Sequence, residues 1–268
     1  MYYLVGWLKM VHITKEEIER ILAKEINHDS NNLNNPFEVH VAHTSQELRE
    51  GKRVIVDAFM DYAMFEWLLE DIKDPSHRRS SVSLFAGFIQ RLCCFSGIVL
   101  VAKDKTTGKV VGCAHVNHKN RPVSFPRRIW NMVALGVYLG YHLLFGAIGF
   151  PWFFFKAPMK KYSRRGIACK ALDIEHDKVL DSSKEHLHLI QIAADPNNGQ
   201  QSKGVGGSLL NAVHAIQRAY GLPTYLETDT ERHRKYYERH GFKVEIEYDV
   251  DAGDGDVFKP NFGMVRWV

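Results

Sequence analysis

The sequence is poor in cysteine, and its charges nearly balance. Its four cysteines form no CxxC pair and show no metal-ligand spacing with histidine, so reduced thiols in an intracellular protein are expected and no bound metal is. The net charge is +4, which is short of the clustered basic stripe of a nucleic-acid binder. We therefore expect no nucleic-acid partner, although the small positive surplus can help to attract an anionic cofactor. The cysteines are Cys93, Cys94, Cys113 and Cys169.

Signals for export, internal repeats and low-complexity tracts are also missing. The apolar run at 2–8 has no basic region before it and no clear small-residue cleavage site, so it does not predict a secretory signal. The 268 residues, 45% hydrophobic and 25% charged, have an ordinary globular composition. We expect one elaborated domain in the cytoplasm.

A glycine-rich stretch lies between a predicted strand and a predicted helix. The largely apolar run 187–194 has the length of a strand and ends in a turn cluster, and apolar residues after the glycines repeat at helical spacing as far as Gly221. Such a loop opens a helix with unpaired N–H groups and the positive end of the helix dipole, so a phosphate or pyrophosphate can bind there. The residues expected to bind it are Gln201, Ser202, Lys203, Gly204, Val205, Gly206, Gly207 and Ser208.

Two familiar phosphate loops do not fit this stretch. A Walker A loop needs Lys directly after its second glycine, but Val205 follows Gly204. A Rossmann GxGxxG loop needs a third glycine where Leu209 stands, and it normally follows the first strand of a domain. The remaining pattern is QxxGxG, read as Gln201, Gly204 and Gly206. It resembles the pyrophosphate loop of the GCN5-related N-acetyltransferases (GNAT).

A second block carries the same resemblance. YLET at 225–228 reads as a strand, and YYERHGF at 236–242 as the end of a short helix that stops at glycine. The order is similar to the final GNAT motif, in which a helix brings a tyrosine to the cofactor thiol and the GF pair starts the next strand. The closing stretch 262–268 is similar to the last strand of the family. One departure is Thr230, where many members carry Asn, but threonine also caps helices.

The resemblance implies an α/β (α+β) GNAT fold, with a mixed, mostly antiparallel central sheet flanked by helices. The domain would span 37–268, after an N-terminal helical extension and linker at 1–36. The chain looks closest to the small eukaryotic, fungal-type members, whose connection between the third and fourth strands carries helices. Here that connection would be an apolar helical insert at about 120–172.

The residue pattern also predicts the elements before this insert. The alternating stretch 37–42 reads as a first strand, and an apolar stripe over 45–69 predicts a helix that Ser45 can cap. A further helix follows Asp74, and two strands within 97–116 form an antiparallel hairpin. In the family, the helices between the first two strands have a loop that lines the acceptor pocket.

The insert contains the most apolar part of the chain. From Ile129 to Phe155 there is no Asp, Glu, Lys or Arg, which by length and hydropathy makes this stretch a transmembrane candidate. The strands on either side of it should be neighbours in one sheet, so both its ends must emerge on the same side. A re-entrant hairpin or an interfacial helix pair therefore fits better than a single crossing. A buried helix that extends the core over the sheet is the alternative, and both readings stay open.

Acetyl transfer from a thioester to an amine needs a polarised carbonyl, a neutral amine and a proton for the departing thiolate. A strand that splays from its neighbour has free backbone groups for the carbonyl and for the pantetheine amides. The strand before the glycine loop would offer those of Ile192, Ala193 and Ala194.

Two side chains are predicted to move the protons. Tyr237 is the expected acid, because a phenol of pKa about 10 can hydrogen-bond the thiolate and give it a proton as charge develops. Glu227 is the first choice for the base that the amine needs, since members of this family often carry Glu there. Asp229, His186, His188 and a water chain stay open as alternatives.

The sequence thus predicts an acetyl-CoA-dependent N-acetyltransferase that uses acetyl-CoA as cosubstrate and no metal. It would acetylate a primary amine of a small molecule or peptide by direct attack in a ternary complex, and the acceptors of this fold vary widely. One alternative is a membrane-associated adaptor that binds acyl-CoA without turnover. Another is transfer of a longer acyl chain, for which the apolar insert would provide the groove.

Overall fold

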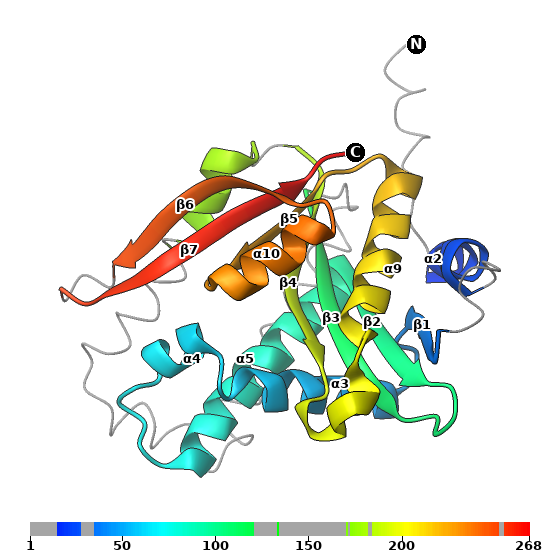
Figure 1. Ribbon diagram of the computed structural model, residues 1–268, viewed down its shortest axis with the longest axis horizontal. Helices are drawn as coiled ribbons and strands as arrows, with labels where there is room; N and C mark the ends of the chain where they lie inside the picture. Colours follow the sequence, from blue (N-terminus) through cyan, green and yellow to red (C-terminus); the bar gives the residue numbers. More distant parts are fainter. Residues whose placement is uncertain are drawn as a thin grey trace.

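A seven-stranded sheet forms the centre of the protein (Figure 1). The computed structural model describes residues 15–27, 35–120, 133, 170, 172–181, 184–251 and 255–268. The strand order is β1-β2-β3-β4-β5-β7-β6, and every neighbouring pair is antiparallel except β4 and β5, which are parallel. The predicted fold class, a mixed and mostly antiparallel sheet flanked by helices, is confirmed. The stretch 129–155 of the predicted insert lies outside the described residues, apart from Val133.

The elements follow the predicted order closely. The strands are β1 Phe37–Val41, β2 Gly97–Asp104, β3 Val110–Lys119, β4 His186–Ala194, β5 Thr224–Thr228, β6 Lys243–Asp251 and β7 Val257–Arg266. The helices are α2 Lys15–Leu22, which a π-helical turn Ala23–Asn27 extends, α3 Ser45–Phe59, α4 Ala63–Leu68, α5 Pro75–Ser96, α9 Val205–Tyr220 and α10 Glu231–Arg239. A 3-10 segment Pro196–Ser202 precedes α9, and 172–179 is also helical.

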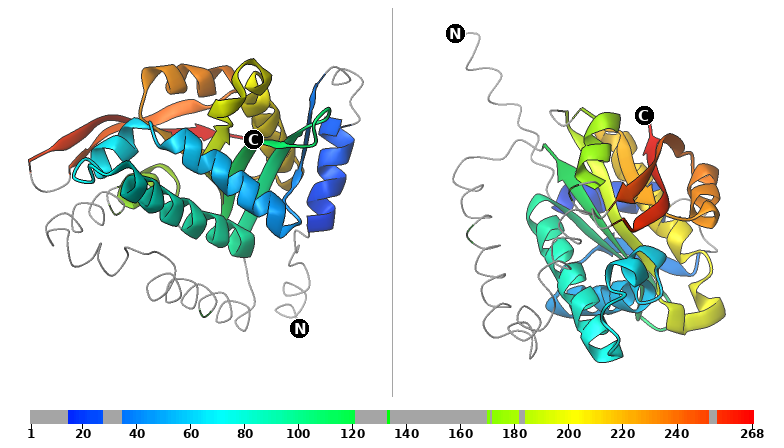
Figure 2. Two further views of the ribbon diagram at one scale, coloured as in Figure 1. Left: turned by 90° about the horizontal axis from the view of Figure 1, so that it is seen from below. Right: turned by 90° about the vertical axis from the view of Figure 1, so that its left-hand side faces the viewer.

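Helices cover both faces of the sheet (Figure 2). Side chains of a strand alternate between the two faces, so neighbouring residues of β2 enter different cores. Leu100 packs with α2 and α9 on one face, whereas Val101 packs with α3 and α5 on the other. In the described part of the chain, no helix has both the length and the apolar character that a membrane crossing requires.

The stretch predicted as one helix over 45–69 is two helices, so that prediction was wrong. The helix α3 ends at Phe59, and α4 starts at Ala63 after a turn. The cap of α3 is Thr44 rather than Ser45, because Thr44 and Glu47 form a reciprocal capping box. The turn between the helices brings Tyr62 and the start of α4 toward the carboxyl end of β5, where the Met64 N–H donates to Asp229 Oδ2 at 3.1 Å.

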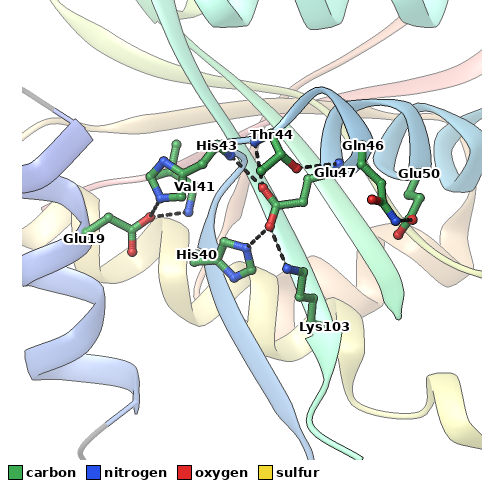
Figure 3. A network of polar contacts seen from close by, with 9 residues as sticks. All are labelled: Glu19, His40, Val41, His43, Thr44, Gln46, Glu47, Glu50 and Lys103. Carbon is green, nitrogen blue, oxygen red and sulfur yellow. Dashed lines mark hydrogen bonds and ion pairs between the residues drawn. The ribbon is translucent and has the colours of Figure 1, made fainter. Parts of the chain in front are cut away.

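A buried carboxylate joins β1, β2 and α3 (Figure 3). Glu47 accepts hydrogen bonds from the backbone N–H groups of His43 at 2.8 Å and Thr44 at 2.9 Å. It also pairs with Lys103 Nζ at 2.6 Å and His40 Nε2 at 3.0 Å. Burial alone would raise the pKa of Glu47, but these donors outweigh it and hold the pKa well below the usual range.

The helix α2 packs on the domain rather than standing apart from it. Ile18 and Leu22 are buried in the core shared with β1 and α9. Glu19 Oε1 accepts from the Val41 backbone N–H at 2.6 Å and contacts His43 Nε2 at 3.0 Å (Figure 3). These contacts fix α2 at the end of β1.

Candidate active site

The two parallel strands at the centre of the sheet separate after three pairs. The paired residues are Leu187 with Thr224, His188 with Tyr225 and Leu189 with Leu226. Beyond Leu189, β4 continues along β3 to the pair of Ala194 with Gly112, but no further residue of it is paired with β5. The predicted splay is therefore present. Backbone groups at 190–194 that face β5 are left for another partner.

The glycine loop leads from this opening into α9. Gly204 has φ 90° and ψ −13°, a left-handed conformation that favours glycine, and it is the N-cap of the helix. No side chain caps this end of α9, and the Ser208 N–H makes the first helical bond, to the Gly204 carbonyl at 2.9 Å. The N–H groups of Val205, Gly206 and Gly207 therefore lie at the positive end of the helix dipole without helical acceptors.

Not every predicted cofactor-binding residue offers its side chain there. The Val205 side chain is buried, and Lys203 is exposed. Ser208 is tied to Asn35, whose Nδ2 donates to Ser208 Oγ at 3.1 Å. Gln201 and Ser202 end the 3-10 segment. If this loop binds an anion, as predicted, the backbone N–H groups after Gly204 are its main donors.

An ion-pair network that sequence reasoning missed holds the start of this loop against α3. Asp195 accepts from Arg53 Nη2 at 2.7 Å and from the Asn197 N–H at 2.9 Å. Asp57 accepts from Arg53 Nη1 at 3.1 Å and from Asn197 Nδ2 at 3.2 Å. Burial raises the pKa of Asp195, but these donors outweigh it and lower the pKa below its ordinary value.

The adjacent residues Tyr236 and Tyr237 of α10 contact different parts of the protein. A Cβ atom added to Gly206 would lie 2.8 Å from Tyr236 Oη, so this hydroxyl reaches the first turn of α9. Tyr237, the predicted acid, is half-buried and packs against Phe242 with a ring-centroid distance of 5.8 Å. Burial raises the pKa of Tyr237, and Tyr236 and Asp229 raise it further. Tyr237 is therefore a protonated phenol at neutral pH, as a proton donor must be.

Glu227, the predicted base, faces a cluster of histidines. Its Oε1 accepts from Tyr225 Oη at 3.1 Å, and its Oε2 lies 3.7 Å from His188 Nε2. Behind these residues, His186 Nε2 lies 2.9 Å from Nε2 of His176, a residue of the helical stretch 172–179. Burial lowers the pKa of His186, and it lowers that of His176 to about 3, so both rings are neutral at physiological pH. Sequence reasoning missed His176.

Asp229, one of the alternative bases, lies near Tyr237, the predicted acid, and its charge raises the pKa of that phenol. Its side chain is buried, and its Oδ2 accepts from the Met64 N–H, near the start of α4, at 3.1 Å. Burial raises the pKa of Asp229. Tyr62 also interacts with this carboxylate and is stacked with His233, with ring centroids 6.1 Å apart. Tyr62 and His233 carry no sequence motif, so they could not be selected before the fold was known.

The described residues offer no set of side chains for a metal ion. In the ranges that the structure describes, no three His, Cys, Asp or Glu side chains converge in a way that would hold a metal ion.

Comparison with solved structures identifies the architecture. A Corynebacterium glutamicum protein described as histone acetyltransferase HPA2 and related acetyltransferase is 21% identical and has a TM-score of 0.53, over 87% of this chain and 96% of that one. An Aedes aegypti protein that carries the name arylalkylamine N-acetyltransferase 7 is 14% identical with a TM-score of 0.50, over 85% and 86% of the two chains. The chain has the fold of the GNAT superfamily.

A curated relative agrees with this GNAT fold. An uncharacterized N-acetyltransferase of Schizosaccharomyces pombe is 30% identical over 89 residues, which are 33% of this chain. The match spans 37% of that relative's length. No family model matches the chain. The GNAT fold that the resemblance of the two motif blocks implied is thus confirmed.

The GNAT fold brings most of the predicted site into one region. The free edge of β4 and the first turn of α9 lie on one side of the opening, and Tyr237 and Asp229 lie with α10 and the end of β5. Glu227 stands on β5 too, but its two oxygens are directed to Tyr225 and His188.

Proposed function

We propose that this chain is an acetyl-CoA-dependent N-acetyltransferase that acetylates a primary amine. The observation that carries the proposal is the separation of parallel strands β4 and β5 and the uncapped N-terminus of α9, whose first turn α10 reaches through Tyr236. The protonated phenol of Tyr237 stands on the same helix α10. The name of the Schizosaccharomyces pombe relative supports the reaction class. The name of the mosquito protein supports a small-molecule amine as acceptor. A peptide amine, which the sequence also predicted, is the other possible acceptor.

The chain's residues fit a pyrophosphate and a pantetheine arm. The backbone N–H groups after Gly204 would hold the pyrophosphate, and the exposed Lys203 adds a positive charge beside them. The unpaired edge of β4, including Ile192, Ala193 and Ala194, would hold the pantetheine amides and the thioester carbonyl. Bound acetyl-CoA would supply the activated acetyl group.

Proton movements complete the reaction in a ternary complex. A carboxylate at the carboxyl end of β5, where Glu227 and Asp229 stand, takes a proton from the bound ammonium, and the neutral amine then attacks the carbonyl carbon. The carbon–sulfur bond breaks, and Tyr237 gives its proton to the thiolate. The second proton that the nitrogen loses restores the phenol. No acyl-enzyme intermediate is needed.

Two other functions are kept from the sequence, a binding adaptor and a transferase of longer acyl chains. A binding adaptor without turnover would share the α9 site, and transfer of a longer acyl chain would use the apolar stretch 129–155. Membrane association of an otherwise cytoplasmic protein through that stretch also stays a prediction.

A panel of acyl-CoA chain lengths tested against a panel of amines separates these functions. We expect amine-dependent release of free thiol, fastest with acetyl-CoA. Tight CoA binding without thiol release for any amine would favour the adaptor. A maximum at long chains would favour the longer-chain transferase.

A further inference from the structure

One buried oxygen atom of Asp229 has no hydrogen bond of standard geometry among the described residues, although the Tyr62 hydroxyl interacts with the carboxylate. Only 4% of the residue is exposed. Oδ2 accepts from the Met64 N–H, but Oδ1 makes no hydrogen bond of standard geometry with any described residue. An unpaired carboxylate oxygen away from water costs free energy, so proteins normally give such an atom a donor. A ligand with N–H groups would provide one.

The groups around Asp229 suit a cationic ligand. Asp229 shifts the pKa of Tyr62, His233 and Tyr237, so these residues of the turn before α4 and of the helix α10 lie near the carboxylate. All three residues are partly buried. Aromatic rings attract ammonium groups, and an ionised carboxylate attracts them more strongly. Arg232 is the nearby cation, and it acts on His233.

Glu227 lacks these properties. Its Oε1 already accepts a hydrogen bond from Tyr225 Oη at 3.1 Å, and its side chain is less buried than that of Asp229, while Oε2 lies 3.7 Å from His188 Nε2. By contrast, the charge of Asp229 acts directly on Tyr237, the proposed acid. A base and an acid that serve one reacting centre must lie close to the same atoms.

We propose that Asp229, rather than Glu227, binds the ammonium group of the acceptor and takes its first proton. The inference rests on the proposed function and names the residue that receives the acceptor. Asp229 Oδ1 accepts an N–H of the ammonium, the N–H bond breaks, and the proton moves to the carboxylate and then to solvent. The nitrogen keeps the electron pair with which it attacks the thioester.

Asp229→Asn tests the proposal, because the amide oxygen still accepts from the Met64 N–H while the charge is lost. Glu227→Gln is the matched control from the same strand. With acetyl-CoA and tyramine, kcat/KM at pH 7 should fall by about 10²- to 10⁴-fold in Asp229→Asn, and this loss should exceed the loss in Glu227→Gln. The loss in Asp229→Asn should shrink as pH rises toward the amine's own pKa, because the medium then supplies neutral amine. If the Asp229→Asn variant shows no thermal unfolding transition, Asp229→Ser replaces it in the same measurements.

A second readout separates this inference from the proposed function. Tyramine binding to the CoA complex, measured by calorimetry, should weaken by at least about tenfold in Asp229→Asn, and more in that variant than in Glu227→Gln. If the wild type acetylates no amine, the proposed function fails, and this binding contrast still decides the role of Asp229. Wild-type binding and an unaltered pH profile in Asp229→Asn, or the larger loss in Glu227→Gln, would overturn the inference.

Discussion

The contact between Gly206 and Tyr236 gives a quantitative prediction about the cofactor loop. Gly206 has no left-handed backbone, so alanine is compatible with its conformation and with the helix, where glycine costs about 0.5–1 kcal/mol relative to alanine. However, the new Cβ would lie 2.8 Å from Tyr236 Oη, which is too close for an unstrained contact. The next atom of that ring, Cζ, lies at 3.7 Å, an ordinary contact distance.

Gly206→Ala alone should therefore lose stability, and Tyr236→Phe should restore it. Overpacking typically costs about 1–3 kcal/mol, which outweighs the helix gain and lowers the free energy of unfolding by up to about 2 kcal/mol. In the double variant the hydroxyl is gone, so only the helix gain of about 0.5–1 kcal/mol remains. Urea unfolding of the four proteins gives the coupling between the two sites, which we expect to be at least about 1 kcal/mol.

The same four proteins test why this glycine is needed. If room for Tyr236 is the reason, stabilisation by CoA in a thermal scan should return in the double variant. If the pyrophosphate itself needs the space, CoA should fail to stabilise the double variant although it is well folded. A coupling near zero would contradict the placement of the Tyr236 hydroxyl at the first turn of α9.

Two further predictions concern single side chains. Tyr237→Phe keeps the ring packing but removes the proton, so CoA should bind with nearly normal affinity in calorimetry while turnover falls by about 10²- to 10⁴-fold; full activity at every pH would discard the acid role. Glu47→Gln should lower the free energy of unfolding at pH 7 by about 1.5–3 kcal/mol, because Lys103 and His40 lose a charged acceptor. The pKa of Glu47 is depressed in the folded protein, so this contribution is present above the unfolded pKa of about 4.3 and is lost as pH falls below it. The urea-derived stabilities of the two proteins should therefore begin to converge below about pH 4 and become equal only below the depressed folded pKa, and a difference that is constant with pH would refute the charge argument.

The sequence was most informative where the determinants are local. The strand period, the glycines and the helix period that define β4, the loop and α9 follow each other directly along the chain, so all three were predicted correctly. The cap of α3 was misassigned by one residue although the signal was present. Thr44 has Glu47 three positions later, which is the capping-box spacing, whereas Ser45 does not.

The break between α3 and α4 has no local signal. No glycine or proline stands between Phe59 and Ala63, and no side chain of the turn caps α4. Asp229 supplies an acceptor for the Met64 N–H from 165 residues further along the chain. Asp229 is brought near Tyr62 by the same tertiary contact, which the sequence does not reveal, so sequence reasoning ranked it below Glu227.

A single-turnover experiment can distinguish direct acetyl transfer from a route through an acetylated protein. Enzyme in excess over acetyl-CoA is mixed with tyramine, quenched at intervals, and the masses of the amine and of the intact protein are recorded. With direct transfer, the acetyl group appears on the amine nitrogen as free CoA appears, while the mass of the protein does not change. CoA release without an acetylated amine, or an acetylated protein that later passes its group to the amine, would contradict direct transfer in a ternary complex.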